Sequence, residues 1–321
     1  MTCEVGCRAE FAKRKPMRVA IEAGTHSPWA SRVLKDLGHE VIVANPRKLK
    51  LSYRSNKKND QVDARSLARV ARMDVELLAP IQHRSIDAQE HLALIRARDA
   101  LVRSRTQLIN HVRGAVKSIG GRLPPSSSDA FPRLAKHIPE ALWTALSPLV
   151  NTIASLASDI KKYDREIERL AEQEYPETKS LRQVGGVGPL TSLTFVLTIE
   201  DPRRFEKSRQ VGAYLGLCPR QDESGTIRRQ LGITKAGDVF VRRLLVGAAQ
   251  YILGPFGGDC DLRRWGLELA KKGGKNAKKR AVVAVARKLA VLLHRLWITG
   301  LPYEPLRNSN RKNLQVATTL A

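Results

Sequence analysis

The sequence predicts an α/β segment followed by a longer, mostly helical region. Near the N-terminus two short apolar runs flank a helical pattern, which is typical of a strand–helix–strand unit. From about residue 85 onward, apolar residues recur at intervals of three and four over long stretches, which indicates helices. With 321 residues the chain is long enough for two or three domains.

The charge balance predicts a polyanionic partner. There are 56 Lys and Arg residues against 31 Asp and Glu, a formal net charge of +25. This excess is larger than solubility requires, so nucleic acid is the natural partner; a basic surface protein without a specific ligand is the plainer alternative. The four cysteines fit reduced thiols in the cytoplasm, and no apolar run approaches the roughly 20 residues of a membrane span.

The α/β segment is expected over residues 17–80, after an unplaced basic N-terminal segment, 1–16. Residues 17–22 form a short strand that ends at Glu22, and Ser27-Pro28 begin a helix that stops at Gly38. Residues 41–44 form a second strand, so the pair is predicted to be parallel. Glu22 then lies at the carboxyl end of its strand, where open α/β sheets bind their ligands.

Two acids open the next predicted helix. The i, i+3 and i+4 spacing places Asp60, Asp63, Leu67 and Val70 on one stripe, so both carboxylates are expected to point inward. Acids in a first helical turn also cap the helix and complement its dipole, which is the plainer explanation. Because Glu22 is expected at the same sheet edge, the three carboxylates favour a Mg²⁺ site that activates a water or hydroxyl.

Residues 81–175 are predicted to form a helical coiled-coil or dimerisation segment. Ile95, Val102, Ile109 and Val116 are spaced one heptad apart, and apolar residues from Leu142 to Leu170 alternate at intervals of four and three. Ser147-Pro148 suits a helix start inside this second run. The apolar seam can pair with the preceding helix or with another subunit, which would give a dimer or tetramer.

Residues 176–300 are predicted to form a mostly helical C-terminal domain, followed by a polar tail, 301–321. The Gly186-Val187-Gly188 turn before an apolar helix at 190–199 resembles a helix–hairpin–helix element, whose glycines let the backbone approach phosphate. A loop-rich stretch to Gly237 then precedes a helix from about Val239 to Leu253.

Ser224 is the candidate nucleophile. A serine hydroxyl among guanidinium groups can attack phosphorus, because the cations stabilise the negatively charged transition state. An ordinary turn is the plainer explanation, since serine is common in turns. The candidate nucleic-acid contacts are the two glycines and six nearby cations: Gly186, Gly188, Arg220, Arg228, Arg229, Lys235, Arg242 and Arg243.

In combination, these motifs resemble the DEDD-type transposases of the insertion-sequence family numbered 110, with its 1111, 116 and 902 relatives. The resemblance covers about residues 17–300. In the first half it is carried by Glu22-Ala23-Gly24, Asn45-Pro46 and Asp60-x-x-Asp63-Ala64-Arg65. In the second half it is carried by Val184-Gly185-Gly186-Val187-Gly188, Tyr214-Leu215-Gly216-Leu217, Ser224-Gly225 and Gly232-Ile233-Thr234-Lys235.

The resemblance implies a site-specific DNA recombinase with an RNase H/RuvC-like metal domain and a C-terminal transposase domain. Glu22, Asp60 and Asp63 would be the second, third and fourth acids of the DEDD set and hold Mg²⁺. Ser224 would join covalently to DNA. The implied partners are DNA and a structured guide RNA.

One departure from the family pattern concerns the first Asp of the DEDD set. No Asp precedes Glu22, and only Glu4 and Glu10 do. We therefore expect a RuvC-like domain that is truncated at its N-terminus. The chain is then either an active transposase or a catalytically impaired DNA- or RNA-binding remnant; a third alternative is a basic scaffold whose coiled coil recruits partners.

Overall fold

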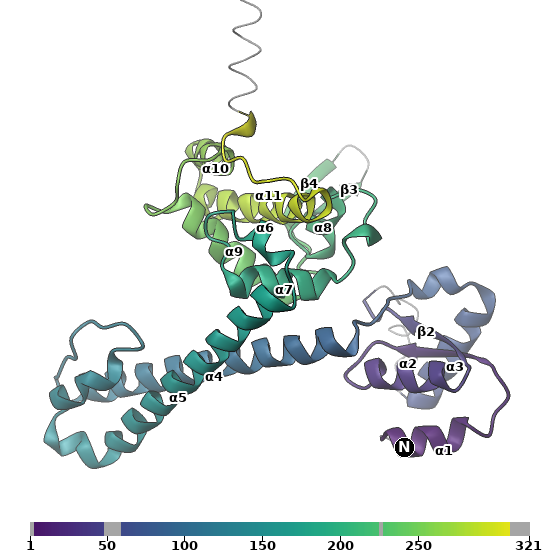
Figure 1. Cartoon of the computed structure of the whole chain (residues 1–321), viewed down its shortest axis with the longest axis horizontal. Coiled ribbons are helices and arrows are strands. Elements are labelled where there is room, and N and C mark those ends of the chain that lie inside the picture. Colours follow the sequence, from purple (N-terminus) through teal and green to yellow (C-terminus); the bar gives the residue numbers. More distant parts are fainter. Residues whose placement is uncertain (1–2, 48–58, 225–226, 309–321) are drawn as a thin grey trace, which may run out of the picture. The chain divides into compact units, whose positions relative to one another are not determined.

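The computed structural model describes residues 3–47, 59–224 and 227–308, except for the side chains of residues 222–230 (Figure 1). It divides into two compact units, Met1–Ser85 and Ile86–Ala321. Most of the described residues are helical, with two small two-stranded sheets.

The N-terminal unit is built on a strand–helix–strand motif, as the sequence predicted. Its strands are β1 (Arg18–Glu22) and β2 (Glu40–Ala44), which pair in parallel with Glu22 opposite Ala44. The helices are α1 (Glu4–Phe11), α2 (Ser27–Asp36), α3 (Asp60–Met73) and the 3-10 helix η2 (Val75–Leu78). Helix α1, which packs on α2, lies in the segment that the sequence left unplaced.

Alternate residues of the two strands pack on opposite faces of this sheet. Val19 and Ile21 belong to the apolar cluster formed with α2, together with Val33 and Leu34. Ala20 instead packs in a second cluster, with β2 and with α3 and η2. Successive side chains of a strand point to opposite faces, so Glu22 shares the α3 face with Ala20.

The second unit begins with a long helical hairpin. Helix α4 (Ile86–Ser118) and helix α5 (Glu140–Gln173) flank the 3-10 helix η3 (Phe131–His137). Ile109, Val112 and Val116 cluster with Leu146, Val150 and Ile153. Nearer the hairpin base, Ala88, Leu92 and Ile95 cluster with Ile167 and Leu170. The two helices therefore run antiparallel, and the apolar seam of α5 pairs with the preceding helix of the same chain.

The sequence placed a possible start of this second helix at Ser147-Pro148, which is wrong. Helix α5 begins at Glu140 and continues through Pro148. Leu146 and Val150 on either side are buried against α4, and this packing holds the helix together where proline removes one backbone hydrogen bond.

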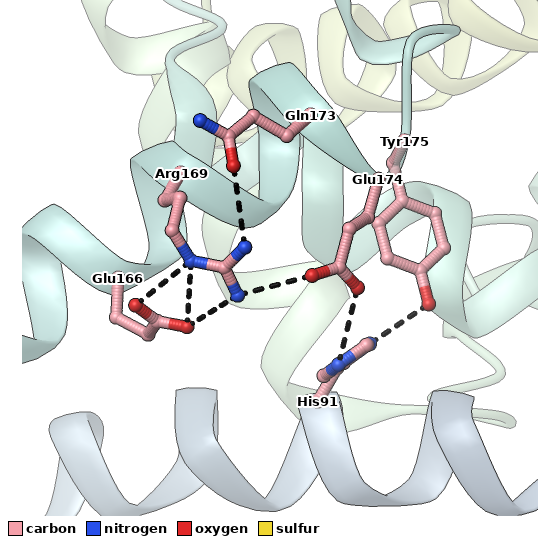
Figure 2. A network of polar contacts seen from close by, with 6 residues as sticks. All are labelled: His91, Glu166, Arg169, Gln173, Glu174 and Tyr175. Atoms are coloured by element: carbon pink, nitrogen blue, oxygen red, sulfur yellow. Dashed lines mark hydrogen bonds and ion pairs between the residues drawn. The ribbon is translucent and has the colours of Figure 1, made fainter.

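A polar network joins the two helices where α4 begins and α5 ends (Figure 2). His91 of α4 lies with Nδ1 2.8 Å from the Tyr175 hydroxyl and Nε2 3.7 Å from a carboxylate oxygen of Glu174. Arg169 bridges Glu174 at 3.0 Å and Glu166 at 2.7 Å, and its hydrogen bonds lower the pKa of Glu166. Such solvent-exposed ion pairs add little stability. The His91–Tyr175 contact links the first turns of α4 to the chain just after α5.

The rest of the unit is a helical domain around one large apolar core. Its short helices are α6 (Thr178–Leu181), η4 (Pro202–Arg204) and α8 (Arg209–Tyr214). The longer ones are α7 (Pro189–Ile199), α9 (Val239–Leu253), α10 (Asp261–Lys271) and α11 (Ala277–Thr299). Among the residues that the structure describes, no helix combines the length and apolar character needed to cross a membrane.

An antiparallel hairpin of β3 (Pro219–Ser224) and β4 (Ile227–Ile233) lies where the sequence predicted only loops. Both strands are mostly polar, so they lack the apolar alternation by which a strand is recognised. The hairpin is defined by backbone hydrogen bonds between its strands, and the amino-acid composition does not indicate such pairing.

Candidate active site and nucleic-acid interface

Helix α3, which carries Asp60 and Asp63, packs on the face of the sheet to which Glu22 belongs by strand alternation. The side chain of Arg18 donates to the carbonyl oxygen of Ala71 at 3.1 Å, so the end of α3 lies beside the start of β1. From there, Glu22 is about 13 Å along the strand. Asp63 is about 12 Å back along the helix. Glu22 and α3 therefore lie on the same face of the sheet.

The carboxylates are more exposed than the sequence indicated. Glu22 and Asp60 are exposed, and Asp63 is half-buried, whereas Val70 further along the stripe is buried. The prediction that both aspartates point inward is therefore wrong for Asp60, which lies one turn beyond the edge of the packed surface.

The helix cap is supplied by another residue. The side chain of Asn59 accepts a hydrogen bond from the backbone N–H of Gln61 at 2.9 Å. Capping therefore does not account for Asp60 or Asp63, although both still complement the helix dipole. Within the described parts of the chain, no three His, Cys, Asp or Glu side chains are grouped closely enough to hold a metal ion. Glu22, Asp60 and Asp63 belong to the same side of the sheet, and in the described structure they do not form a closed ligand set.

Ser224 is the last residue of β3 and pairs with Ile227 at the end of the β3–β4 ladder. The same ladder pairs Glu223 with Arg228 and Asp222 with Arg229. The side chains of Ser224, Arg228 and Arg229 lie outside the described part of the structure. Arg220 on β3 and Lys235 just after β4 are both exposed.

The base of this hairpin is fastened by Arg242, which was predicted to contact nucleic acid. Arg242 is only 8% exposed, and its Nη1 donates to the carbonyl oxygens of Leu215 at 2.9 Å and Ala236 at 2.6 Å. It therefore joins the segment before β3 to the segment after β4. We correct its assignment from phosphate contact to structural residue, because a buried guanidinium held by two carbonyls is not available to DNA.

The two segments that Arg242 joins also touch directly. The backbone N–H of Lys235 donates to the carbonyl oxygen of Gly216 at 3.1 Å. Gly216 has φ +69°, and a β-carbon there would lie 2.2 Å from the carbonyl oxygen of Ala236. Only glycine fits this close approach, so the segments before β3 and after β4 can stay in direct contact at the base of the hairpin.

The exposed Arg243 is engaged elsewhere. It forms an ion pair with Asp99 of α4, and its guanidinium lies 4.8 Å from the ring centre of Phe240. Arg96 of α4 pairs with Asp238 at 3.2 Å next to the same helix. Arg243 therefore holds α9 to the helical hairpin, and a phosphate would have to compete with Asp99 for it.

The predicted helix–hairpin–helix turn packs against α9. Gly186 has φ +84°, and a β-carbon there would lie 2.9 Å from Cδ1 of Tyr251 and 3.1 Å from the carbonyl oxygen of Ala248. Gly188 precedes α7 at its N-cap position, and a β-carbon there would meet nothing within 4 Å. Gly186 is thus required by packing, while Gly188 is the glycine whose surroundings leave room for a ligand.

Two family models match the sequence. One, described as the transposase IS116/IS110/IS902 family, matches residues 178–255, which include the serine hairpin. The other, a DEDD transposase model of the IS110 group, matches residues 6–120. A transposase for insertion sequence element IS1111A from Coxiella burnetii is 30% identical over 285 residues, covering 86% of this chain and 76% of the relative.

The chain belongs to the IS110-type family of insertion-sequence transposases. Two further relatives of similar extent agree. A putative transposase of Sinorhizobium fredii, y4pF/y4sB, is 31% identical over 91% of this chain and 76% of the relative. A probable family 20 transposase of Pseudomonas aeruginosa is 29% identical over 92% of this chain and 88% of the relative. Residues 256–308, with α10 and α11, lie beyond the ranges that the two family models match.

Proposed function

We propose that this transposase cuts and joins DNA with Ser224 as the nucleophile and with Mg²⁺ held by Glu22, Asp60 and Asp63 in an RNase H/RuvC-like domain. The observation that supports the proposal is that α3, which carries Asp60 and Asp63, packs on the sheet face to which Glu22 belongs. Membership of a family of insertion-sequence transposases supplies the reaction class. The proposed site of action is the cytoplasm.

The donor chemistry suits the metal. Carboxylate oxygens are preferred ligands of Mg²⁺, and all three side chains are at least partly accessible. A bound ion would activate a hydroxyl and stabilise a leaving oxygen.

The step assigned to Ser224 is a transesterification. The Oγ–P bond forms as one P–O bond to a deoxyribose oxygen breaks, and the serine proton ends on the released oxygen. One phosphodiester replaces another, so no further reactant is needed. Arg220 and Lys235 are exposed near the base of the same hairpin, where cations favour a DNA backbone.

The proposed partners are DNA, a structured guide RNA and further copies of the chain. The apolar seam of α5 is already occupied by α4, so a dimer or tetramer would have to use another surface of the hairpin. The exposed Arg103 of α4 forms an ion pair with Asp99 at 3.1 Å, so part of the charge on that surface is already compensated within the chain.

The test is formation of a covalent protein–DNA adduct by the full chain, with DNA carrying the element ends, RNA transcribed from the element, and Mg²⁺. We expect an adduct that survives denaturation, its loss in Ser224→Ala, and unchanged DNA affinity in that variant. Ser155→Ala, on the exposed face of α5, is the matched control and should keep the adduct. An undiminished adduct in Ser224→Ala would move the nucleophile to another residue.

The metal site is tested separately by Mn²⁺ binding, followed by electron paramagnetic resonance. Glu22→Gln and Asp63→Asn should each weaken binding, whereas Glu40→Gln, at the other end of the sheet, should not. If the wild-type chain binds DNA but forms no adduct under any condition, the alternative function replaces the first: a transposase-derived protein that binds nucleic acid without cutting it.

A further inference from the structure

A large groove lies in the C-terminal unit between α10, α11 and residues 301–308. Its volume is about 1210 Å³. Most of its lining residues come from the part of the chain that neither family model matches. None of the residues singled out from the sequence as a nucleic-acid contact lines it.

Cations dominate the rim of this α10–α11 groove. Five of them form no ion pair with an acid within the described structure: Arg209, Arg287, Lys288, Arg295 and Arg307. Helix α11 supplies three of the five and contains no acidic residue along its whole length. Arg287 and Lys288 are neighbours in sequence, so their charges repel each other wherever no anion lies between them.

The acids of the groove are mostly engaged with other groups. Glu268 pairs with Lys271 at 2.6 Å, and the Asp261 carboxylate accepts from the backbone N–H of Asn308 at 2.7 Å. For the third lining carboxylate, that of Glu304, the described residues provide neither a hydrogen bond nor an ion pair. The groove therefore carries a clear excess of positive charge.

The floor of the groove is apolar and partly aromatic. It is lined by Leu262, Trp265, Val291, Leu292, Leu296 and Tyr303. The Nζ of Lys288 lies 3.6 Å from the centre of the Trp265 ring, so this charge is held over an aromatic residue of the floor. Burial there and the neighbouring Arg287 lower the pKa of Lys288.

We propose that the α10–α11 groove binds single-stranded nucleic acid, with phosphates on the rim cations and bases against the apolar floor. A duplex hides the faces of its bases from the floor, whereas a single strand can place its phosphates on the rim and its bases on the floor at the same time. The inference rests on the proposed function in that the partner is nucleic acid. It does not depend on the chemistry of Ser224.

The experiment compares the full-length chain with the double variant Arg209→Gln/Arg295→Gln. Both side chains are exposed and unpaired in the described structure, so their loss should not affect folding. The probes are fluorescent oligo(dT), oligo(U) and a mixed-sequence duplex of the same length. We expect the double variant to bind single strands about tenfold or more weakly, and to bind the duplex nearly as well as the wild type.

Two matched variants separate the groove from general charge. Lys278→Gln/Lys279→Gln removes the same charge from the exposed start of α11, outside the groove, and should leave single-strand binding nearly unchanged. Arg209→Lys/Arg295→Lys keeps the charge in place and should retain most of the affinity. Comparing oligo(dT) with oligo(U) tells whether DNA or RNA is the preferred strand.

Equal losses for single strand and duplex, or equal effects of the two Gln pairs, would overturn the inference. Strong binding of inorganic polyphosphate in competition with the oligonucleotides would also overturn it, because polyphosphate has no bases for the floor. If the wild type bound no nucleic acid at all, the proposed function itself would fail. If the chain bound duplex normally and the Arg209→Gln/Arg295→Gln variant bound single strands as well as the wild type, only this inference would be refuted.

Discussion

Replacing Arg242 by Ala separates a structural role from a role in DNA binding. The substitution removes the donor for two carbonyl oxygens, those of Leu215 and Ala236, at the base of the serine hairpin. A buried acceptor left unpaired costs about 1–3 kcal/mol, so the two together should lower the free energy of unfolding by about 3 kcal/mol or more. For a unit of this size, that corresponds to a fall in melting temperature of about 6–12 °C.

The assay is urea unfolding of the full chain, with hydrogen exchange at the amides of Thr234 and Lys235, which pair across the hairpin base. Exchange there should accelerate, and Arg242→Lys should lie between the wild type and Arg242→Ala. Arg243→Ala is the neighbouring control and should cost only about 0–1 kcal/mol, since its pair with Asp99 lies at the surface. An Arg242→Ala variant with wild-type stability and weakened DNA binding would refute this reasoning and restore Arg242 as a phosphate contact.

Three further outcomes are expected. Gly186→Ala should destabilise the C-terminal unit by about 1–3 kcal/mol in urea unfolding, because the new β-carbon would combine a positive φ with contacts under 3.4 Å. Gly188→Ala should be nearly neutral, and equal effects of the two substitutions would contradict the packing argument. Burial lowers the pKa of His294, so below about pH 6.5 the imidazole is protonated in the unfolded chain more readily than in the native chain. The free energy of unfolding should therefore fall as the pH drops below about 6.5, and it should fall less in His294→Gln. A urea midpoint that does not change with pH would contradict this expectation. Duplex affinity should drop by about 10³–10⁵ between 50 and 200 mM salt if about six to ten phosphates are contacted; a flat salt profile would exclude an electrostatic interface.

The elements with strong local patterns were predictable from the sequence. The parallel pairing of β1 and β2 followed from two apolar runs around a helix with Pro28 in its first turn. Helix α9 spans the residues predicted for it, Val239–Leu253, because its apolar residues recur with the helical period between Asp238 and Gly254. Local spacing carries this information.

What escaped prediction depends on contacts between distant residues. The β3–β4 hairpin has polar strands, and the burial of Arg242 arises from two carbonyls that are 27 and 6 residues away in sequence. Nothing in the residues around Arg242 distinguishes it from the exposed Arg243. The basic groove likewise brings α8, α10, α11 and residues 301–308 together, so no single stretch of sequence contains it.

The distance from the base of the helical hairpin to its tip is set by the lengths of its two helices. Helices α4 and α5 contain 33 and 34 residues, so the chain travels about 50 Å outward and returns by nearly the same distance. Adding or deleting seven residues in both helices together would move the tip, with its buried Phe131, by about 10 Å. The His91–Tyr175 contact and the start of α6 would keep their places, since they belong to the base. The length of the hairpin can therefore change in steps of seven residues without altering the helical domain at its base.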